Sequence, residues 1–200
     1  MQLISSPASP FSRVVMVLLQ ETRQTQDVEI LPVTTTPTAT DAQVRAANPL
    51  GKIPALIRDD GPTLYDSRVI CRFLDSRAGA GLYPPERIWE VLTLEATAHG
   101  IMEAAVLMVY EHRLRPPEKV FDPLIEAQWD KITRAVAAVN ARWMSHLNGP
   151  LDISHVAMGC ALGYLDLRHA DRSWRKGNDA LDDWFAVFAE RPAMTATAPQ

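Results

Sequence analysis

The hydrophobic pattern divides the chain near residue 83. Before that point short β-type runs alternate with helical patterns, and after it the apolar spacing is helical throughout. A strand is predicted over 2–4, a helix over 10–20 and a second strand over 28–33. The crossover of such a βαβ unit is right-handed in almost every known case, so the two strands are expected to lie parallel in one sheet.

A second group of elements follows a Thr- and Pro-rich loop over 34–41. The runs 53–58 and 63–65 flank an Asp-Asp-Gly turn, in which the Asp-Gly pair supplies the positive φ that a tight hairpin requires. A helix is predicted directly afterwards, over 67–78. The order βαβ, loop, ββα therefore predicts an α/β domain over 1–80 with a mixed four-stranded sheet.

The rest of the chain is predicted to be helical. A long apolar stripe at helical spacing begins near Glu86, and Asp122, as N-cap with Pro123 at the first helical position, opens a second helix. Asp152 caps a third helix, whose small residues let neighbouring helices approach closely, so this helix should be the most buried. A last helix covers 179–190, and together these elements predict an all-α domain over 86–200.

Composition excludes several classes of function. The chain has 200 residues, 47% of them hydrophobic, and its 24 Asp and Glu exceed its 20 Lys and Arg. Without a basic field no nucleic-acid partner is expected, and apolar runs such as 104–110 fall far short of the ~20 residues that span a membrane. The two cysteines, Cys71 and Cys160, are expected to be reduced, and the absence of a signal-peptide pattern favours the cytoplasm.

The junction between the first strand and the first helix reads Ser9-Pro10-Phe11-Ser12. Ser9 is a good N-cap and Pro10 a good first helical residue, which explains both without any function. A helix N-terminus also stabilises an anion such as a thiolate, and a hydroxyl placed there can donate to it. Ser9 has no adjacent histidine to act as a base, so donation rather than nucleophilic attack is the role it could take.

A second cluster combines Lys52 with Asp66 and Ser67. Each residue has an ordinary structural explanation, as a solvated charge or as a helix cap. Taken together, they offer a cation for one carboxylate, an acceptor for an ammonium group and a hydroxyl at a helix N-terminus for a second carboxylate. This set matches a small zwitterionic peptide with two acidic ends.

Three stretches carry a resemblance to a known family: S-P-A-S-P-F-S-R-V-V at 6–15, N-P-L-G-K-I-P-A-L at 48–56 and Y-D-S-R-V-I at 65–70. The chain resembles cytosolic glutathione transferases, in particular a bacterial group with serine at the thiol-activating position, over essentially its whole length. The resemblance implies a thioredoxin-like glutathione-binding domain, an all-helical C-terminal domain, a cytoplasmic homodimer and a role in detoxification.

The resemblance also implies roles for individual residues. Ser9 would activate the thiol of glutathione, which conjugates to a small hydrophobic electrophile. Lys52 would face the glycyl carboxylate, Asp66 the γ-glutamyl ammonium and Ser67 the γ-glutamyl carboxylate. Ile53 would bind the cysteinyl part through its backbone, preceding a cis Pro54. The electrophile is expected to contact residues of a second-substrate pocket between the domains, for which the candidates are Phe11, Arg13, Met102 and Tyr110.

The same junction separates subtypes of this superfamily. Members that form mixed disulfides read C-P-F-C or C-P-F-A, whereas Ser9 and Ser12 stand at both cysteine positions here. We therefore expect a transferase and not a thiol-disulfide reductase. A non-catalytic module that binds a protein partner or sequesters ligands is the alternative, because one fold hosts many functions. No metal is expected, since the histidines form no H-x-x-x-H pair and the cysteines no zinc motif.

The third helix of the second domain departs from the family pattern. The family opens this helix with a [ST]-x-x-D box, whereas the present chain has Asp152 at the cap and His155 at the third helical position. Asp152 can still accept from backbone N–H groups. The reciprocal side-chain arm of the box is expected to be lost.

Overall fold

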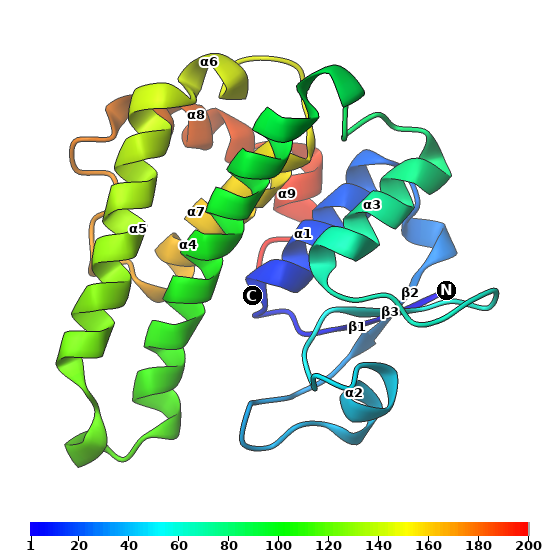
Figure 1. The fold of residues 1–200 in the computed structure, drawn as a ribbon, viewed down its shortest axis with the longest axis horizontal. Coiled ribbons are helices and arrows are strands. Elements are labelled where there is room, and N and C mark those ends of the chain that lie inside the picture. The colour runs from blue at the N-terminus through cyan, green and yellow to red at the C-terminus, as the bar shows by residue number, and fades with distance from the viewer. Residues whose placement is uncertain (200) are drawn as a thin grey trace. The chain divides into compact units, whose positions relative to one another are not determined.

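A computed structural model describes residues 1–199, which form two compact units (Figure 1). One unit is Met1–Glu86 together with Pro192–Gln200, and the other is Arg87–Arg191. The sequence analysis assigned all of 86–200 to the helical domain, whereas the structure returns its last residues to the first unit. The reason is a buried contact, because Arg13 Nη2 donates to the backbone oxygen of Met194 at 3.0 Å.

The first unit contains a three-stranded mixed sheet in the order β2-β1-β3. The central strand β1 (Gln2–Ser5) pairs in parallel with β2 (Glu29–Pro32) and antiparallel with β3 (Ala55–Ile57). The parallel βαβ unit and the antiparallel third strand are thus as predicted. In the β1–β3 register, Ile4 lies opposite Ala55.

The prediction of a fourth strand over 63–65 is wrong. Only one bridge joins this segment to the sheet, in which Leu56 and Leu64 exchange backbone hydrogen bonds of 2.9 Å in both directions. Pro62 precedes the segment and has no N–H to donate, and Asp66 follows it as the cap of the next helix. The segment 63–65 between Pro62 and Asp66 is too short to form a series of hydrogen bonds with β3.

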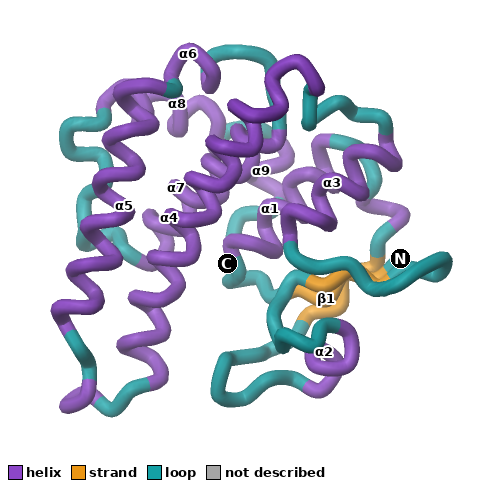
Figure 2. The backbone as a smooth tube through the Cα atoms, viewed as in Figure 1, coloured by secondary structure: helices purple, strands orange, loops and turns teal. Residues whose placement is uncertain are grey.

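Helices cover both faces of this sheet (Figure 2). Helices α1 (Pro10–Glu21) and α3 (Ser67–Ala78) pack together on one side, and α2 (Ala42–Ala47) lies on the other. Val44 of α2 forms a buried cluster with Ile4 and Ala55. Short helices complete the unit and its boundary: η1 (Thr25–Asp27), η2 (Pro85–Arg87) and α9 (Pro192–Ala196).

The second unit is a bundle in which α4 (Ile88–Leu114) packs against both α5 (Asp122–Arg142) and α7 (Ile153–Arg168). The first ten residues of α7 are all buried, which confirms it as the core helix. Its small residues, such as Gly159, permit this close packing. The remaining helices are η3 (Pro117–Lys119), α6 (Met144–Leu147) and α8 (Asp179–Ala189).

The helical stretch Pro85–Leu114 meets the length and composition criteria for a membrane-spanning helix. The core helix of a water-soluble protein meets the same criteria. In the structure 56% of the most apolar 18-residue part of this helix is buried inside the protein, because α5 and α7 pack against it. This burial is the property of a core helix.

The cap of α7 differs from the expectation. Asp152 accepts from the backbone N–H of Ser154 at 3.0 Å, as an N-cap should. The reciprocal arm, expected to be lost, has its geometry in place, because Nδ1 of His155 lies 3.3 Å from the backbone N of Asp152 and 3.0 Å from its Oδ1. Without a proton this nitrogen accepts from the backbone N–H, and with a proton it donates to the carboxylate instead. A neutral imidazole has one unprotonated nitrogen, so histidine can replace the acidic side chain of the usual box.

Removing this cap should destabilise the second unit. We expect Asp152→Ala to lower the free energy of unfolding by about 2–4 kcal/mol, because a buried helix loses its cap and the polar groups around the carboxylate lose their partner. Asp122→Ala is the matched control, because the prediction of Asp122 as the N-cap of α5 is wrong. The cap is Phe121, which makes no side-chain hydrogen bond, and Asp122 is the first residue of the helix. Its effect should stay within about 0.5 kcal/mol. Equal losses in urea denaturation would contradict a special role for Asp152.

Candidate functional site

The strand register brings three predicted site segments to one end of the sheet in the first unit. β1 runs toward the loop that precedes α1, and β3 is antiparallel to it, so the start of β3 lies beside the end of β1. The segment around Leu64 runs back along β3 and reaches this same end before α3 begins. The candidates Ser9, Pro54 and Asp66 therefore come from chain segments that meet there.

Ser9 is the N-cap of α1 and is half-buried. Its Oγ accepts from the backbone N–H of Ser12 at 3.2 Å, and its own N–H donates to the carbonyl oxygen of Ser6 at 3.0 Å. No acidic side chain stands in the first turn of α1. The hydroxyl oxygen is thus oriented by the helix, while its O–H remains able to donate to an anion placed at the positive end of the helix.

A side chain that the sequence analysis did not single out holds the turn before β3. Asn48 is only 2% exposed, its Nδ2 donates to the carbonyl oxygen of Lys52 at 2.9 Å, and its Oδ1 accepts from Leu50 N at 3.0 Å. Gly51 has φ +64°, and the peptide bond between Ile53 and Pro54 is cis. The Asn-Pro dipeptide was the available signal, because asparagine commonly bonds its own backbone in turns.

The N-terminus of α3 presents the two remaining candidates. Asp66 is the N-cap and accepts from Arg68 N at 3.0 Å, while its other oxygen pairs with the Arg68 guanidinium at 3.1 Å. The Asp66 side chain is 54% exposed, so it is accessible from solvent. Ser67 follows it at 1% exposure, and Lys52 is exposed. The peptide bond between Tyr65 and Asp66 is also cis.

The candidates for a second-substrate pocket are distributed over both units. Phe11 is half-buried in the first unit, and Tyr110 is half-buried in the second. Arg13 is buried and committed to Met194, and Met102 is fully buried in α4. In this structure the side chains of Arg13 and Met102 serve packing, and the contact of all four with a substrate stays a prediction.

Both cysteines lie within helices. Cys71 is in α3 and Cys160 is in α7, and both side chains are 0% exposed. A thiol needs access and thiolate character to exchange disulfides. The burial of both thiols therefore limits their access to a disulfide substrate.

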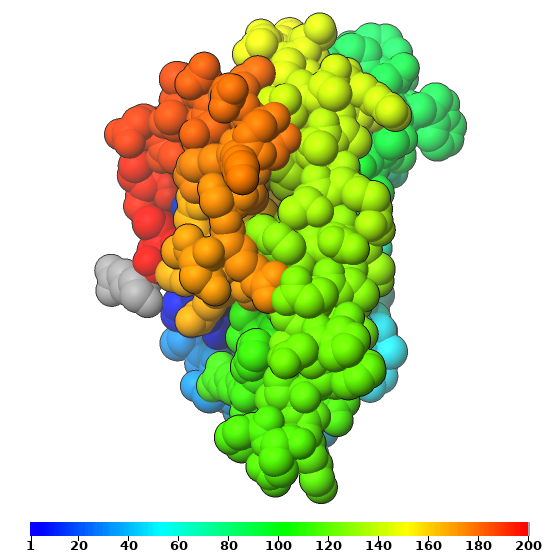
Figure 3. Space-filling model, turned by 90° about the vertical axis from the view of Figure 1, so that its left-hand side faces the viewer, coloured from blue at the N-terminus to red at the C-terminus, as the bar shows by residue number. Residues whose placement is uncertain are grey.

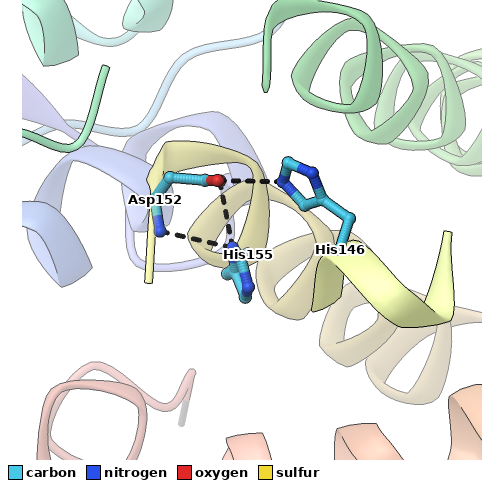
Figure 4. A group of neighbouring side chains, drawn as sticks. All are labelled: His146, Asp152 and His155. Atoms are coloured by element: carbon cyan, nitrogen blue, oxygen red, sulfur yellow. Dashed lines mark hydrogen bonds and ion pairs between the residues drawn. The ribbon is translucent and has the colours of Figure 1, made fainter. Parts of the chain in front are cut away.

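A polar cluster around Asp152 lies in the second unit (Figure 4). The carboxylate is fully buried, and its oxygens lie 2.8 Å from Nε2 of His146 and 3.0 Å from Nδ1 of His155. Arg87 Nη1 stands 3.6 Å away. Burial alone would raise the pKa of Asp152, but hydrogen bonds from His155 and Ser154 outweigh it and lower the pKa to about 2.

Within residues 1–199, His146, Asp152 and His155 are the one group of this kind whose ligand atoms lie close enough to hold a metal ion, all within 4.8 Å. The arrangement is better explained as a helix cap. The carboxylate already contacts both rings, the α7 N-terminus is the positive end of a helix dipole, and Arg87 adds a full positive charge. A divalent cation would have to displace the contacts between the Asp152 carboxylate and the two rings. It would also be repelled by the α7 N-terminus and by the Arg87 guanidinium.

A mixed sheet covered by helices, joined to a helical bundle, defines a two-domain protein of the glutathione-transferase type. The family model of the glutathione S-transferase N-terminal domain matches residues 3–84, and that of the C-terminal domain matches residues 122–186. A glutathione transferase family member from Pseudomonas fluorescens Pf-5, solved with bound glutathione, is 46% identical over 100% of this chain and 98% of that chain, with a TM-score of 0.97. The chain belongs to the glutathione S-transferase family.

Two further relatives extend this similarity. A structure from Pseudomonas fluorescens Pf-5 with bound S-(propanoic acid)-glutathione is 44% identical, covers 100% of this chain and 99% of that chain, and has a TM-score of 0.92. An uncharacterized GST-like protein, YibF, from Escherichia coli strain K12 is 28% identical over 204 residues, which are 100% of this chain and 98% of that protein.

The Asp152 cluster should make stability depend on pH. Burial lowers the pKa of His146 below its ordinary 6.5, so the unfolded chain binds this proton more strongly and stability should fall as the pH drops below about 6.5. Burial lowers the pKa of His169 in the same direction. Asp152, with a pKa of about 2 against 3.8, contributes stability above pH 3.8 that is lost toward pH 2.

Urea denaturation over a pH series measures both steps. In the variant His146→Gln, part of the stability loss below about pH 6.5 should disappear, because the titrating histidine is gone. The loss between pH 3.8 and pH 2, which belongs to Asp152, should remain. A free energy of unfolding that stays constant down to pH 3.8 would contradict the role given to burial of His146.

Proposed function

We propose that this protein is a glutathione transferase that joins the sulfur of glutathione to a carbon atom of a small hydrophobic electrophile. The observation that carries this proposal is the orientation of Ser9, whose Oγ accepts from Ser12 N at the start of α1. Bound glutathione in the family member from Pseudomonas fluorescens Pf-5 supports the ligand. The S-substituted glutathione in the second structure supports a carbon substituent on sulfur.

Ser9 and the N-terminus of α1 act on the thiol by stabilising its ionised form. A free thiol has a pKa of about 8.5, so only a small part of it is thiolate at neutral pH. The positive end of the helix and a hydrogen bond from the Ser9 hydroxyl both favour the anion. Each unit by which the pKa falls corresponds to about 1.4 kcal/mol of stabilisation of the thiolate.

The two ends of glutathione are held by the other two segments. Lys52 binds the glycyl carboxylate, and Asp66 and Ser67 bind the ammonium and carboxylate groups of the γ-glutamyl end. The backbone N–H and C=O of Ile53 pair with the cysteinyl residue in the manner of an added strand. The Asn48 hydrogen bond to Lys52 O keeps this turn in place for the peptide.

The chemical step is a nucleophilic attack. The thiolate forms a carbon–sulfur bond with its electron pair, and the electrophile either releases a leaving group with the bonding pair or takes up a proton after addition. Ser9 donates a hydrogen bond and keeps its own proton. With serine at positions 9 and 12, no protein thiol stands there to form a mixed disulfide, which favours conjugation over thiol-disulfide exchange.

The remaining parts of the proposal follow from membership of the family. We place the enzyme in the cytoplasm as a homodimer with a role in detoxification, and without a metal. Phe11 and Tyr110, both half-buried, are the candidates with side chains still accessible to an electrophile.

Replacing Ser9 with alanine tests the proposed activation. We expect Ser9→Ala to raise the pKa of bound glutathione by about one to two units, because one hydrogen bond to a charged group is lost. Conjugation of an aryl halide near neutral pH should slow roughly tenfold, while glutathione affinity changes only a few-fold. Thiolate ultraviolet absorbance measures the pKa, and calorimetric titration measures the affinity.

Ser6→Ala is the matched control, because Ser6 contacts Ser9 through its backbone oxygen. This variant should leave the thiol pKa unchanged. An unchanged pKa in Ser9→Ala removes Ser9 from the mechanism. Tight glutathione binding without turnover of any electrophile would instead favour the non-catalytic module.

Replacing Asp66 with asparagine separates glutathione binding from helix capping. Asparagine caps a helix about as well as aspartate, so α3 should keep its start while the charge facing the ammonium group is lost. We expect Asp66→Asn to weaken glutathione binding about tenfold or more. Calorimetric titration with glutathione measures this change.

The control for this variant is Asp41→Asn. Asp41 caps α2 in the same way, accepting from Gln43 N at 2.7 Å, but lies outside the proposed site. Its glutathione affinity should stay within about twofold of the unaltered protein. Equal weakening in both variants would show that Asp66 acts through stability and not through the ammonium group.

A further inference from the structure

Arg13 of α1 is a positive charge buried inside the first unit, with its residue only 8% exposed. Its Nη2 donates to the backbone oxygen of Met194 at 3.0 Å, and its Nε is buried without a hydrogen-bond partner. Within residues 1–199 no carboxylate forms an ion pair with this guanidinium. In Figure 3 the red C-terminal segment, which includes α9, lies beside dark-blue atoms of the N-terminal segment.

The contact with Met194 does not account for the charge of Arg13. A backbone carbonyl oxygen needs only a donor, and a neutral side-chain amide such as that of glutamine provides one. Burying an unpaired charge costs far more free energy than burying a neutral polar group. The hydrogen bond to α9 therefore explains a donor at position 13, but not a cation.

Arg13 is placed four residues after Ser9, the N-cap of α1. Its backbone N–H donates to the carbonyl oxygen of Ser9 at 3.1 Å and closes the first turn of the helix. Side chains four residues apart share a helix face, and long helical side chains lean toward the N-terminus. Helix dimensions put the guanidinium on the order of 10 Å from the Ser9 hydroxyl. Its charge thus adds to the positive end of the helix dipole.

The elements packed against α1 leave this charge uncompensated in the part of the chain that the structure describes. The first turn of α1 has no acidic side chain, and α9 has no charged residue. Asp75 accepts from Leu82 N at 2.8 Å, and Asp27 pairs with Arg77 at 2.8 Å. Glu21 stands two turns farther along α1. The charged residues of the packed η1 and α3 are Asp27, Arg68, Arg72, Asp75 and Arg77.

We propose that Arg13 stabilises the thiolate of bound glutathione from a distance, as a buried positive charge that does not touch the ligand. This inference rests on the proposed function, in which the sulfur lies at the N-terminus of α1. Attraction between the two charges is weakly screened because the guanidinium is buried. The thiol gives its proton to solvent, and Arg13 keeps its own.

Two substitutions separate the charge of Arg13 from its packing. Arg13→Gln keeps a donor for Met194 O and removes the charge, whereas Arg13→Lys keeps the charge and loses the guanidinium shape. We expect Arg13→Gln to raise the pKa of bound glutathione by about half a unit to one unit, and Arg13→Lys to leave it within about 0.2 of its value. Thiolate ultraviolet absorbance over a pH series measures the pKa, with the S-methylglutathione complex as the blank.

The pH profile of conjugation is the second measurement. At about pH 6, Arg13→Gln should conjugate an aryl halide about three- to tenfold more slowly than the unaltered protein. At about pH 9 the thiol is ionised in both proteins, so the rates should agree within about twofold. A purely structural role of Arg13 would lower the rate at every pH and would overturn the proposal.

Arg45→Gln is the matched control. Arg45 stands four residues after Asp41, the N-cap of α2, and its backbone N–H donates to the carbonyl oxygen of Asp41 at 3.1 Å. Its side chain is exposed, so the pKa of bound glutathione should stay within about 0.2 of its value. Equal rises in Arg45→Gln and Arg13→Gln would show an effect of net charge and reject a special role for Arg13.

Combination with Ser9→Ala shows whether Arg13 acts on the sulfur or only holds Ser9. A charge that acts through space should raise the thiol pKa in the Ser9→Ala protein by as much as it does when Ser9 is present. If the double variant shows no further rise, Arg13 is a support for Ser9 and the direct effect is excluded.

The outcomes distinguish this inference from the proposed function. A bound thiol that titrates like free glutathione in the unaltered protein would remove the proposed function itself. A lowered pKa that rises in Ser9→Ala but not in Arg13→Gln would overturn only the role of Arg13. Arg13→Met is the second neutral variant, should Arg13→Gln not fold. If neither neutral variant folds and Arg13→Lys does, the charge serves stability and the proposal fails.

Discussion

The antiparallel pairing of β1 with β3 is the constraint on which the candidate glutathione site depends. With Ile4 opposite Ala55, the loop that ends at Ser9 and the turn that ends at Pro54 must leave the sheet at the same end. The single bridge at Leu64 returns the chain to that end before Asp66. Three short segments, far apart in sequence, thus share one place because the strand hydrogen bonds allow no other register.

Buried polar side chains hold the loops that this register positions. The side-chain amide of Asn48 hydrogen-bonds the backbone of Leu50 and of Lys52 in one turn. The carboxylate of Asp152, at the start of α7, contacts two histidines and Arg87. A buried polar group that lost its partners would cost free energy, so each network selects one loop conformation. The first network supports the candidate glutathione site, and the second fixes the core helix of the bundle.

The polar groups of the candidate site in the first unit are complementary to one kind of ligand. The first unit presents a helix N-terminus, Lys52 and Asp66, which suit a zwitterionic peptide with a thiol.

Local sequence patterns determined the βαβ unit, the antiparallel third strand, the long α4 and the buried α7, because apolar periodicity and caps act within one element. The complementary set Lys52, Asp66 and Ser67 was also visible, since it depends on residue type. The absence of a fourth strand, the return of α9 to the first unit and the role of His155 in the cap were decided only by the tertiary structure. These depend on the reach of hydrogen bonds between distant residues.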